Sequence, residues 1–238
     1  MDILYIIAPA YNEAENITQF VDAWYPVVEA HNGNGDSRLV VIDDGSLDDT
    51  YAILQGLATD RPLLTPLTKP NGGHGATLLY GYRYANESGA DYIFQTDSDG
   101  QTDPVEFEAF WERREKYDAI LGHRSDRRDG ASRVFVEQTL LRLLRLIFGV
   151  RMPDANAPFR LMKKDLVAKY LPKMPADFNL PNVMLSTYFV YYKENVTFRA
   201  ISFKPRQGGT NSINMKRIIG IGRKAVAEFW TLRKQMDE

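Results

Sequence analysis

The sequence lacks cysteine altogether, has only three histidines, and contains no long uninterrupted apolar run. The absence of cysteine excludes disulfides, thiolate metal sites and a cysteine nucleophile. His31, His74 and His123 are too scattered to build a zinc site by themselves. Any bound metal would therefore have oxygen ligands and be a hard cation, Mg²⁺ or Mn²⁺.

The chain also lacks a segment that resembles a membrane span or a targeting signal. Its longest uncharged run, residues 178–192, has 15 residues and includes two asparagines and a proline, so it is too short and too polar to cross a bilayer. The apolar stretch at 3–10 lacks the basic start and the length of a signal peptide. We expect a cytoplasmic protein, and peripheral contact with the inner face of the membrane stays open.

Neither sign of charge dominates, because 29 lysines and arginines balance 31 acidic residues to a formal net charge of −2. This balance excludes bulk electrostatic attraction to nucleic acid, which is therefore not an expected partner. The 238 residues show no linker or internal repeat. We expect one domain over residues 1–214 and a basic amphipathic helix over 215–238 that belongs to the same unit. The pattern says nothing about oligomeric state.

Strand-like apolar runs alternate with helical patterns through the first half of the chain. We expect strands at 3–8, 39–42, 63–67, 92–95 and 119–121, and helices at 12–30, from Ser46 onward, at 76–86 and at 104–116. This alternation predicts an α/β fold with a mostly parallel sheet and helices on both faces. The second half predicts a helix at 136–148, an exposed strand at 196–203, a polar loop at 206–214 and a helix at 215–232.

In a sheet of this kind, ligands bind beyond the carboxyl ends of the strands. The segments that follow the expected strands are the most polar and glycine-rich parts of the chain: 9–13, 43–46, 71–75, 97–101 and 122–128. The composition of these segments and the rule for ligand binding in such folds therefore both indicate a site at the carboxyl edge of the sheet.

The sharpest local motif in that set is Asp97-Ser98-Asp99-Gly100-Gln101, directly after a buried strand. Carboxylates two residues apart in an extended turn can point to one side, and Gln101 adds a neutral oxygen. A hard divalent cation prefers such ligands and completes its shell with substrate phosphates and water. The alternative is a solvated turn with side chain to backbone hydrogen bonds, which the position after a buried strand disfavours.

Three other motifs admit both a functional and a structural interpretation. Asp43 and Asp44 can accept hydrogen bonds from a nucleobase or ribose, or serve with Ser46 at a helix start. The glycines around Asn71, in residues 69–75, can admit a ligand close to the backbone or form a flexible turn. Arginines can form a solvated face or bind phosphate. Four of them lie close together in the sequence, and two more lie further along the chain: Arg124, Arg127, Arg128 and Arg133, then Arg160 and Arg206.

These motifs, in this order, resemble glycosyltransferase family 2, the inverting nucleotide-sugar transferases of the GT-A fold. The likeness runs colinearly over residues 3–214 and is greatest to the branch of dolichyl-phosphate mannose synthase and polyprenyl-phosphate glycosyltransferases. The matching segments are Pro9-Ala10-Tyr11-Asn12-Glu13, Asp43-Asp44-Gly45-Ser46 with Asp48 and Thr50, Asp97-Ser98-Asp99-Gly100-Gln101, Gly122-His123-Arg124, Asn156-Ala157-Pro158-Phe159-Arg160 and Arg206-Gln207-Gly208-Gly209-Thr210-Asn211-Ser212.

The resemblance implies roles for individual residues. The nucleotide-sugar would be bound by Pro9, Tyr11, Glu13, Asp44, Asn71 and Asp97, with Asp44 on the base. The divalent cation, Mg²⁺ or Mn²⁺, would be held by Asp97, Asp99 and Gln101. The acceptor phosphate or leaving diphosphate would meet Arg124, Arg133 and Arg206. Catalytic roles would fall to Asp99, Arg124 and Arg206.

The implied reaction moves a sugar, with inversion, from a UDP- or GDP-linked donor to a polyprenyl phosphate. The Glu-Asp pair that supplies the base in hydroxyl-transferring members has no counterpart, and Asp177 is the nearest candidate base for a glycan hydroxyl as the alternative acceptor. A third alternative is a non-catalytic, nucleotide-binding relic of the fold. The basic amphipathic pattern at 215–234 suggests contact with a membrane surface, or a helix packed on the core or on a dimer partner.

Overall fold

The computed structural model describes residues 2–33, 35–125, 131–204 and 215–236, and the side chains of 131–133 and 215–224 lie outside that description. The strands are β1 (Leu4–Ala10), β2 (Arg38–Asp43), β3 (Leu64–Thr68), β4 (Tyr92–Thr96), β5 (Ala119–Arg124), β6 (Phe159–Lys163) and β7 (Val196–Ile201). The α-helices are α1 (Ile17–Ala30), α2 (Thr50–Ala58), α3 (His74–Glu87), α4 (Glu108–Trp111), α5 (Ala131–Phe148), α6 (Lys164–Tyr170), α7 (Pro181–Tyr191) and α8 (Met215–Met236).

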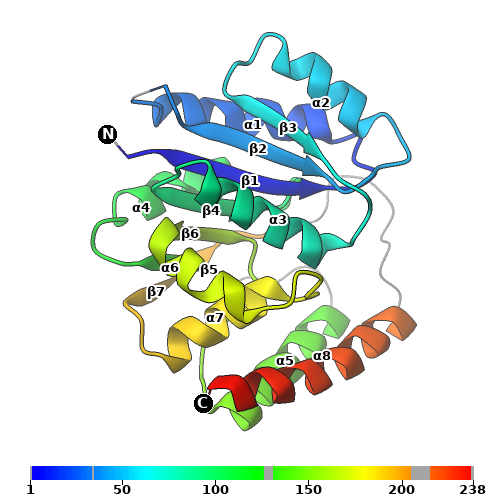
Figure 1. The fold of residues 1–238 in the computed structure, drawn as a ribbon, viewed down its shortest axis with the longest axis vertical. Coiled ribbons are helices and arrows are strands. Elements are labelled where there is room, and N and C mark those ends of the chain that lie inside the picture. Colours follow the sequence, from blue (N-terminus) through cyan, green and yellow to red (C-terminus); the bar gives the residue numbers. More distant parts are fainter. Residues whose placement is uncertain (1, 34, 126–130, 205–214, 237–238) are drawn as a thin grey trace.

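The strands of the described chain form one sheet in the order β3-β2-β1-β4-β6-β5-β7 (Figure 1). Strands β1 to β4 run parallel to one another, β5 and β7 are parallel, and β6 is antiparallel to both β4 and β5. The predicted α/β fold with a mostly parallel sheet is confirmed. Strand β6 was not predicted, because it is short and the buried Arg160 at its second position interrupts the apolar pattern.

Helices cover both faces of the sheet and bury a separate apolar core on each (Figure 1). Alternation along β1 divides its side chains, so that Tyr5 and Ile7 face the core beneath α3, α6 and α7. Leu4 and Ile6 face the core beneath α1, α2 and α4. A strand buried on both faces is uniformly apolar, which is why β1 reads as a continuous hydrophobic run.

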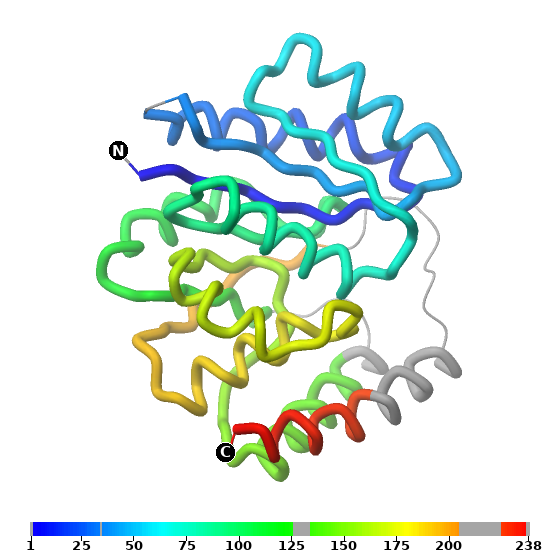
Figure 2. The backbone as a smooth tube through the Cα atoms, in the orientation of Figure 1, coloured from blue at the N-terminus to red at the C-terminus, as the bar shows by residue number. Residues whose placement is uncertain are grey.

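Helices α5 and α8 lie side by side at one end of the molecule (Figure 2). The rings of Phe148 on α5 and Phe229 on α8 meet edge to face with centroids 5.9 Å apart. Ala225, Phe229 and Leu232 are buried, whereas Trp230, which directly follows Phe229, is 51% exposed. In the described segments, no helix combines the length and the apolarity that a bilayer crossing requires.

Several helix bounds differ from the sequence-based expectation, and the helices α6 and α7 were not predicted. Helix α2 begins at Thr50 and not near Ser46, because the Ser46 hydroxyl accepts the Asn12 amide at 2.9 Å and Gly45 turns the chain at φ +67°. Helix α1 begins at Ile17, after a turn over 11–16. The helix expected at 104–116 is reduced to a 3-10 turn and the short α4, since the charged residues 112–116 offer no apolar face to bury. The expected loop at 206–214 lies outside the described residues.

Candidate active site

The loops after β1, β2 and β4 meet at the carboxyl edge of the sheet, where the sequence predicted a site. The Ser98 hydroxyl donates to the Pro9 carbonyl at 2.8 Å, which joins the loop after β4 to the end of β1. The Asp44 amide donates to the Ala10 carbonyl at 2.8 Å and joins β2 to the same strand. The three polar loops are therefore held against one another by hydrogen bonds.

Asp97 and Asp99 lie half-buried in a turn that Gly100 closes with φ +72°. Oδ1 of Asp97 accepts from Nε2 of Gln95 at 3.1 Å, and Nε2 of His74 lies 3.9 Å from the same oxygen. Oδ1 of Asp99 accepts the Gln101 amide at 3.2 Å. The Asp97 side chain keeps 25% of its surface exposed, so this carboxylate is both anchored inside the protein and accessible from the edge.

Gln101, predicted as a third metal ligand, is buried and bound to the end of the β7 segment. Its Nε2 donates to the Lys204 carbonyl at 2.9 Å, and its own carbonyl accepts the Lys204 amide at 2.8 Å. These bonds bring the chain that leads toward Arg206 to the Asp97–Gln101 turn, while Arg206 itself lies outside the described residues. The role of Gln101 as a metal ligand stays a prediction.

The donor set at this turn fits a hard divalent cation that shares its shell with a ligand. Asp97 and Asp99 offer carboxylate oxygens two residues apart, the ligand type that Mg²⁺ and Mn²⁺ prefer. Within the described segments, no group of three or more His, Cys, Asp or Glu side chains could hold a metal alone. A cation here would need further oxygens from substrate or water, as is usual for Mg²⁺ sites in phosphate-binding enzymes.

The loop after β1 is braced against the loop after β2. The Glu13 amide donates to the Thr50 hydroxyl at 2.9 Å, and the buried Glu13 carboxylate accepts Nδ2 of Asn16 at 2.9 Å. Asn12 adopts a left-handed φ of +53°, which turns the chain between Tyr11 and Glu13. Tyr11 is 41% exposed, whereas Pro9 and Glu13 are buried. Tyr11 is thus the member of this predicted nucleoside-binding set that offers the largest open surface.

Asp44, predicted to contact a nucleobase, holds the glycine-rich loop in the structure. Its carboxylate accepts the amides of Gly72 and Gly73 at 2.9 and 2.8 Å and also binds Nζ of Lys69. Burial alone would raise the pKa of Asp44, but the hydrogen bond from Lys69 and those from the loop outweigh it, so the pKa is lowered. Asn71 is exposed and directly precedes Gly72 and Gly73, so the hydrogen bonds of these two residues to Asp44 hold Asn71 at the same edge. The contact of Asp44 with a base stays a prediction.

Arg124 forms a buried ion pair with Asp154. Its Nε and Nη2 donate to the two carboxylate oxygens of Asp154 at 2.8 and 2.9 Å, and Nη2 also lies 3.3 Å from Oε2 of Glu137. Burial would raise the pKa of Asp154, yet the hydrogen bond and charge of Arg124 outweigh burial and hold that pKa well below its usual value. The predicted phosphate contact of Arg124 stays a prediction, and the side chain of Arg133 lies outside the described residues.

Asp177 lies exposed on the loop between Met174 and α7, which touches the start of α3. A Cβ at Gly75 would lie 2.4 Å from the Phe178 carbonyl oxygen, so only glycine permits this contact. Because His74, the first residue of α3, lies next to Asp97, the contact brings the Asp177 loop toward the same edge as the carboxylates.

Sequence reasoning missed three buried polar residues behind the site: Tyr82 on α3, Gln95 on β4 and Asn182 on α7. They form a chain of hydrogen bonds that ends on Asp97. The sequence did offer one signal for these residues, an uncharged polar side chain inside an apolar run. Such a side chain indicates a buried hydrogen-bonded group, since buried amides are almost always hydrogen-bonded.

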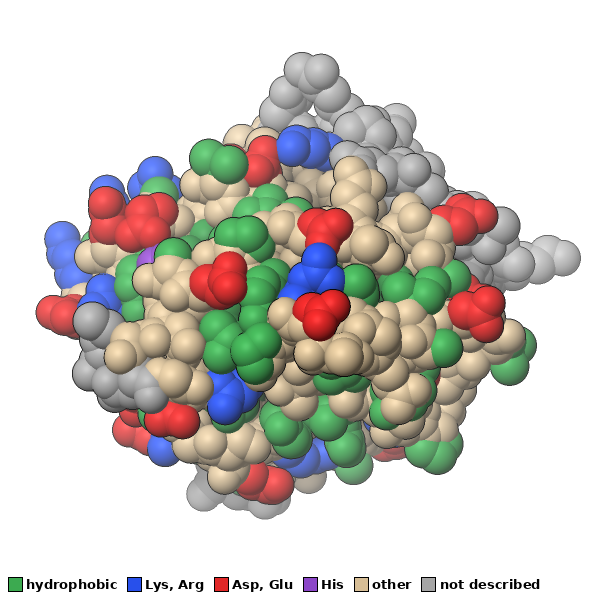
Figure 3. All heavy atoms as spheres, turned by 90° about the horizontal axis from the view of Figure 1, so that it is seen from above, with side chains coloured by type: hydrophobic (Ala, Val, Ile, Leu, Met, Phe, Trp, Pro, Cys, Tyr) green, Lys and Arg blue, Asp and Glu red, His purple; other side chains and the backbone are tan. Residues whose placement is uncertain are grey.

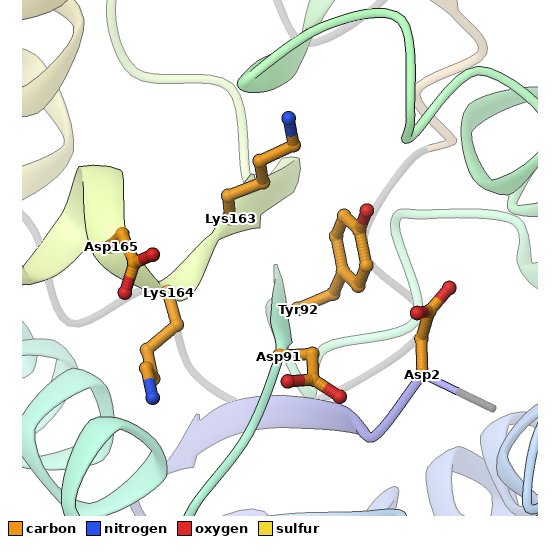
Figure 4. A pocket seen from close by; sticks show the side chains of 6 residues that line it. All are labelled: Asp2, Asp91, Tyr92, Lys163, Lys164 and Asp165. Atoms are coloured by element: carbon orange, nitrogen blue, oxygen red, sulfur yellow. The ribbon is translucent and has the colours of Figure 1, made fainter.

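The opposite edge of the sheet carries a shallow hollow lined by Asp2, Asp91, Tyr92, Lys163, Lys164 and Asp165. Figure 4 shows Lys163 and Lys164 pointing in opposite directions, and Oδ2 of Asp91 accepts the Ile3 amide at 2.8 Å. The side chains do not converge on a common point, so this hollow is not a second candidate active site. On the face shown in Figure 3, acidic and basic side chains are interspersed, in keeping with the balanced net charge.

The architecture is shared with solved structures. Glucosyl-3-phosphoglycerate synthase from Mycobacterium tuberculosis, crystallised with Mn²⁺, UDP and glucosyl-3-phosphoglycerate, superposes with a TM-score of 0.69 at 16% identity, covering 98% of this chain and 80% of that one. The complex of that enzyme with phosphoglyceric acid gives a TM-score of 0.69 at 17% identity, with the same coverage. The fold is that of a GT-A glycosyltransferase.

Residues 5–171 match the model of glycosyl transferase family 2, and the chain belongs to this family. Similar proteins include the undecaprenyl-phosphate 4-deoxy-4-formamido-L-arabinose transferases of Pseudomonas syringae pv. syringae, 25% identical over 91% of this chain, and of Shewanella sediminis, 25% identical over 72%. The matches span 62% and 51% of the length of these two relatives.

Proposed function

We propose that this protein is a glycosyltransferase that moves one sugar from a UDP- or GDP-linked donor to a polyprenyl phosphate, in a reaction that depends on Mg²⁺ or Mn²⁺. The observation that carries the proposal is the pair of partly exposed carboxylates, Asp97 and Asp99, at the carboxyl edge of the sheet. Relatives named as undecaprenyl-phosphate transferases support the acceptor. A neighbour crystallised with Mn²⁺ and UDP supports the donor and the cation.

In this proposal, oxygens of Asp97 and Asp99 hold the cation, which when bound neutralises charge on the donor diphosphate. Tyr11 and Asn71 offer exposed surfaces for the nucleotide at the same edge. A phosphate oxygen of the acceptor forms the new bond to the anomeric carbon while the bond to the diphosphate breaks and its electron pair leaves with the diphosphate. In-line attack inverts the anomeric centre, and an ionised phosphate needs no general base.

The test is transfer of labelled sugar into an organic-extractable lipid phosphate, assayed with a panel of UDP- and GDP-sugars and Mg²⁺ or Mn²⁺. We expect incorporation that EDTA abolishes and that added Mn²⁺ restores. If no nucleotide sugar gives a lipid product, the proposed acceptor is wrong.

The Asp177→Asn variant separates a phosphate acceptor from a hydroxyl acceptor. Because an ionised phosphate needs no base, we expect the variant to keep kcat within about threefold of the wild type, against the roughly 10²- to 10⁴-fold that a general base contributes. The measurement is steady-state transfer to polyprenyl phosphate, with donor affinity measured in parallel. A large loss of turnover with unchanged donor affinity would favour a glycan hydroxyl and Asp177 as its base.

We also propose that the surface of α5 and α8 contacts the membrane that holds the acceptor. Phe135 and Leu146 on α5 and Trp230 on α8 are exposed apolar side chains, and Arg142 and Arg145 are exposed on α5. Apolar side chains flanked by basic ones are typical of helices that lie in a lipid interface.

Co-sedimentation with anionic phospholipid vesicles tests this contact. Trp230→Ala is expected to lower vesicle binding by about tenfold or more, because burying a large apolar side chain is worth about 1.5–3 kcal/mol and each 1.4 kcal/mol is about a factor of ten. Val105→Ser removes an apolar side chain that is 85% exposed elsewhere and serves as the control, with binding unchanged. Equal binding of wild type and Trp230→Ala would contradict the proposed surface.

A further inference from the structure

A directed chain of hydrogen bonds runs through the protein interior and ends on Asp97. Oη of Tyr82 donates to Oδ1 of Asn182 at 2.7 Å, and Nδ2 of Asn182 donates to Oε1 of Gln95 at 2.9 Å. Nε2 of Gln95 then donates to Oδ1 of Asp97 at 3.1 Å. The chain links α3, α7 and β4 to the turn that carries the two carboxylates.

The three interior members are completely or almost completely buried, with exposures of 0% for Tyr82 and Gln95 and 1% for Asn182. Burying amide groups costs free energy that hydrogen bonds only offset, so apolar side chains would serve packing alone at least as well. Ile93, two residues before Gln95 on the same face of β4, shows that this face accepts an aliphatic side chain. Packing therefore does not explain two adjacent buried amides.

All the donors in this chain point toward Asp97. Burial raises the pKa of Tyr82, which keeps its hydroxyl protonated and able to donate. Each amide that accepts at one end donates at the other, and bonds in such a series polarise one another. The last bond ends on a carboxylate, the strongest class of acceptor.

We propose that Gln95 and Asn182 are positioning residues that hold the Asp97 carboxylate in the orientation in which it binds the cation and donor diphosphate, an inference that rests on the proposed function. The terminal torsion of an aspartate is broad, so an unanchored carboxylate samples many orientations. One oxygen fixed to the interior sets the plane of the group. Partners that orient a metal ligand in this way are typically worth about 10- to 100-fold in metal affinity or activity.

The Gln95→Met variant tests the inference, because methionine keeps the unbranched shape and removes both hydrogen-bonding groups. The measurement is titration calorimetry with UDP and with GDP, each with and without Mn²⁺. We expect the Mn²⁺-dependent gain in nucleotide affinity to fall about 10- to 100-fold, and metal-free nucleotide affinity to stay within twofold. Thr187→Val is the matched control, since Thr187 is equally buried on α7 but donates only to the Val183 carbonyl. Its affinities should equal those of the wild type.

A double-mutant cycle separates positioning from a general packing defect. In the Asp97→Asn background, adding Gln95→Met should change nucleotide affinity by less than twofold, because the group it orients is already altered. If Gln95→Met does not fold, Tyr82→Phe decides, since it keeps the ring and removes only the first donor; we expect a two- to fivefold loss of the Mn²⁺-dependent gain.

Two results would overturn the inference: a folded Gln95→Met with wild-type Mn²⁺ dependence, or an equal loss in Thr187→Val. If Gln95→Met does not fold, a Tyr82→Phe variant with wild-type Mn²⁺ dependence of nucleotide affinity would overturn the inference. Failure of the proposed function is seen separately, because wild-type protein would then bind neither nucleotide more tightly with Mn²⁺ than without.

Discussion

Replacing Asp99 by asparagine is expected to lower kcat for sugar transfer by about 10²- to 10³-fold, the loss typical when a group that stabilises developing charge is removed. The substitution keeps the shape of the side chain and removes the negative charge on which binding of the proposed divalent cation depends. The same change at Asp97 should have a similar effect. The measurement is initial-rate transfer of labelled sugar over a Mn²⁺ titration.

Asp165→Asn provides the matched control for that experiment. Asp165 is an exposed carboxylate in the hollow at the opposite edge of the sheet (Figure 4), so its loss should leave transfer within about twofold, as is usual for surface changes away from a site. Unchanged rates in Asp97→Asn and Asp99→Asn would show that the carboxylates do not hold a catalytic cation.

Removing Asp154 is expected to destabilise the fold by about 3–5 kcal/mol, because it leaves the Arg124 guanidinium buried without its main partner. The two side chains are only 2% and 11% exposed, and two hydrogen bonds join them. The measurement is the unfolding free energy of Asp154→Ala from urea titration. Asp118→Ala is the control, since its ion pair with Lys163 is 35% exposed on both sides and such surface pairs are worth about 0.2–1 kcal/mol.

The same pair predicts how acid affects stability. Because the folded pKa of Asp154 lies below its unfolded value, this carboxylate contributes stability that is fully present above the unfolded pKa and is lost as pH falls through the folded one. The wild type should therefore lose stability below about pH 4, the ordinary range of an aspartate. Asp154→Ala should show a shallower decline over that interval. Parallel pH profiles for the two proteins would contradict the ion-pair assignment.

The parallel half of the sheet was predictable from sequence because each strand is apolar and each following loop is polar. The Asp97–Gln101 turn follows β4 as expected, whereas the segment at 9–13 begins within β1, which extends to Ala10. Strand β6 escaped prediction for a physical reason, since Arg160 is fully buried there and donates to the carbonyls of Ala155 and Ala157. A buried charge in a strand has no signature in apolar periodicity.

The candidate site was predictable in its position more than in the partners of its residues. Arg124 has the sequence features of a phosphate-binding arginine, yet the structure pairs it with Asp154, thirty positions further along the chain. Gln95 and Asn182 are separated by 87 positions and meet only because the fold brings the start of α7 to β4. Spacing along the chain cannot reveal contacts that depend on which helix covers which strand.

The antiparallel direction of β6 decides where the chain between β5 and β6 begins and ends. Because β6 is antiparallel to both β4 and β5, strands β4 and β5 point the same way, so the backbone leaves β5 at Arg124 on the edge that carries the candidate site and returns at Phe159, which pairs with Thr96. The segment between these two points includes α5, whose Leu144, Ile147 and Phe148 are buried in the core. Side chains at either end of this segment are therefore presented beside the carboxylate turn that follows Thr96.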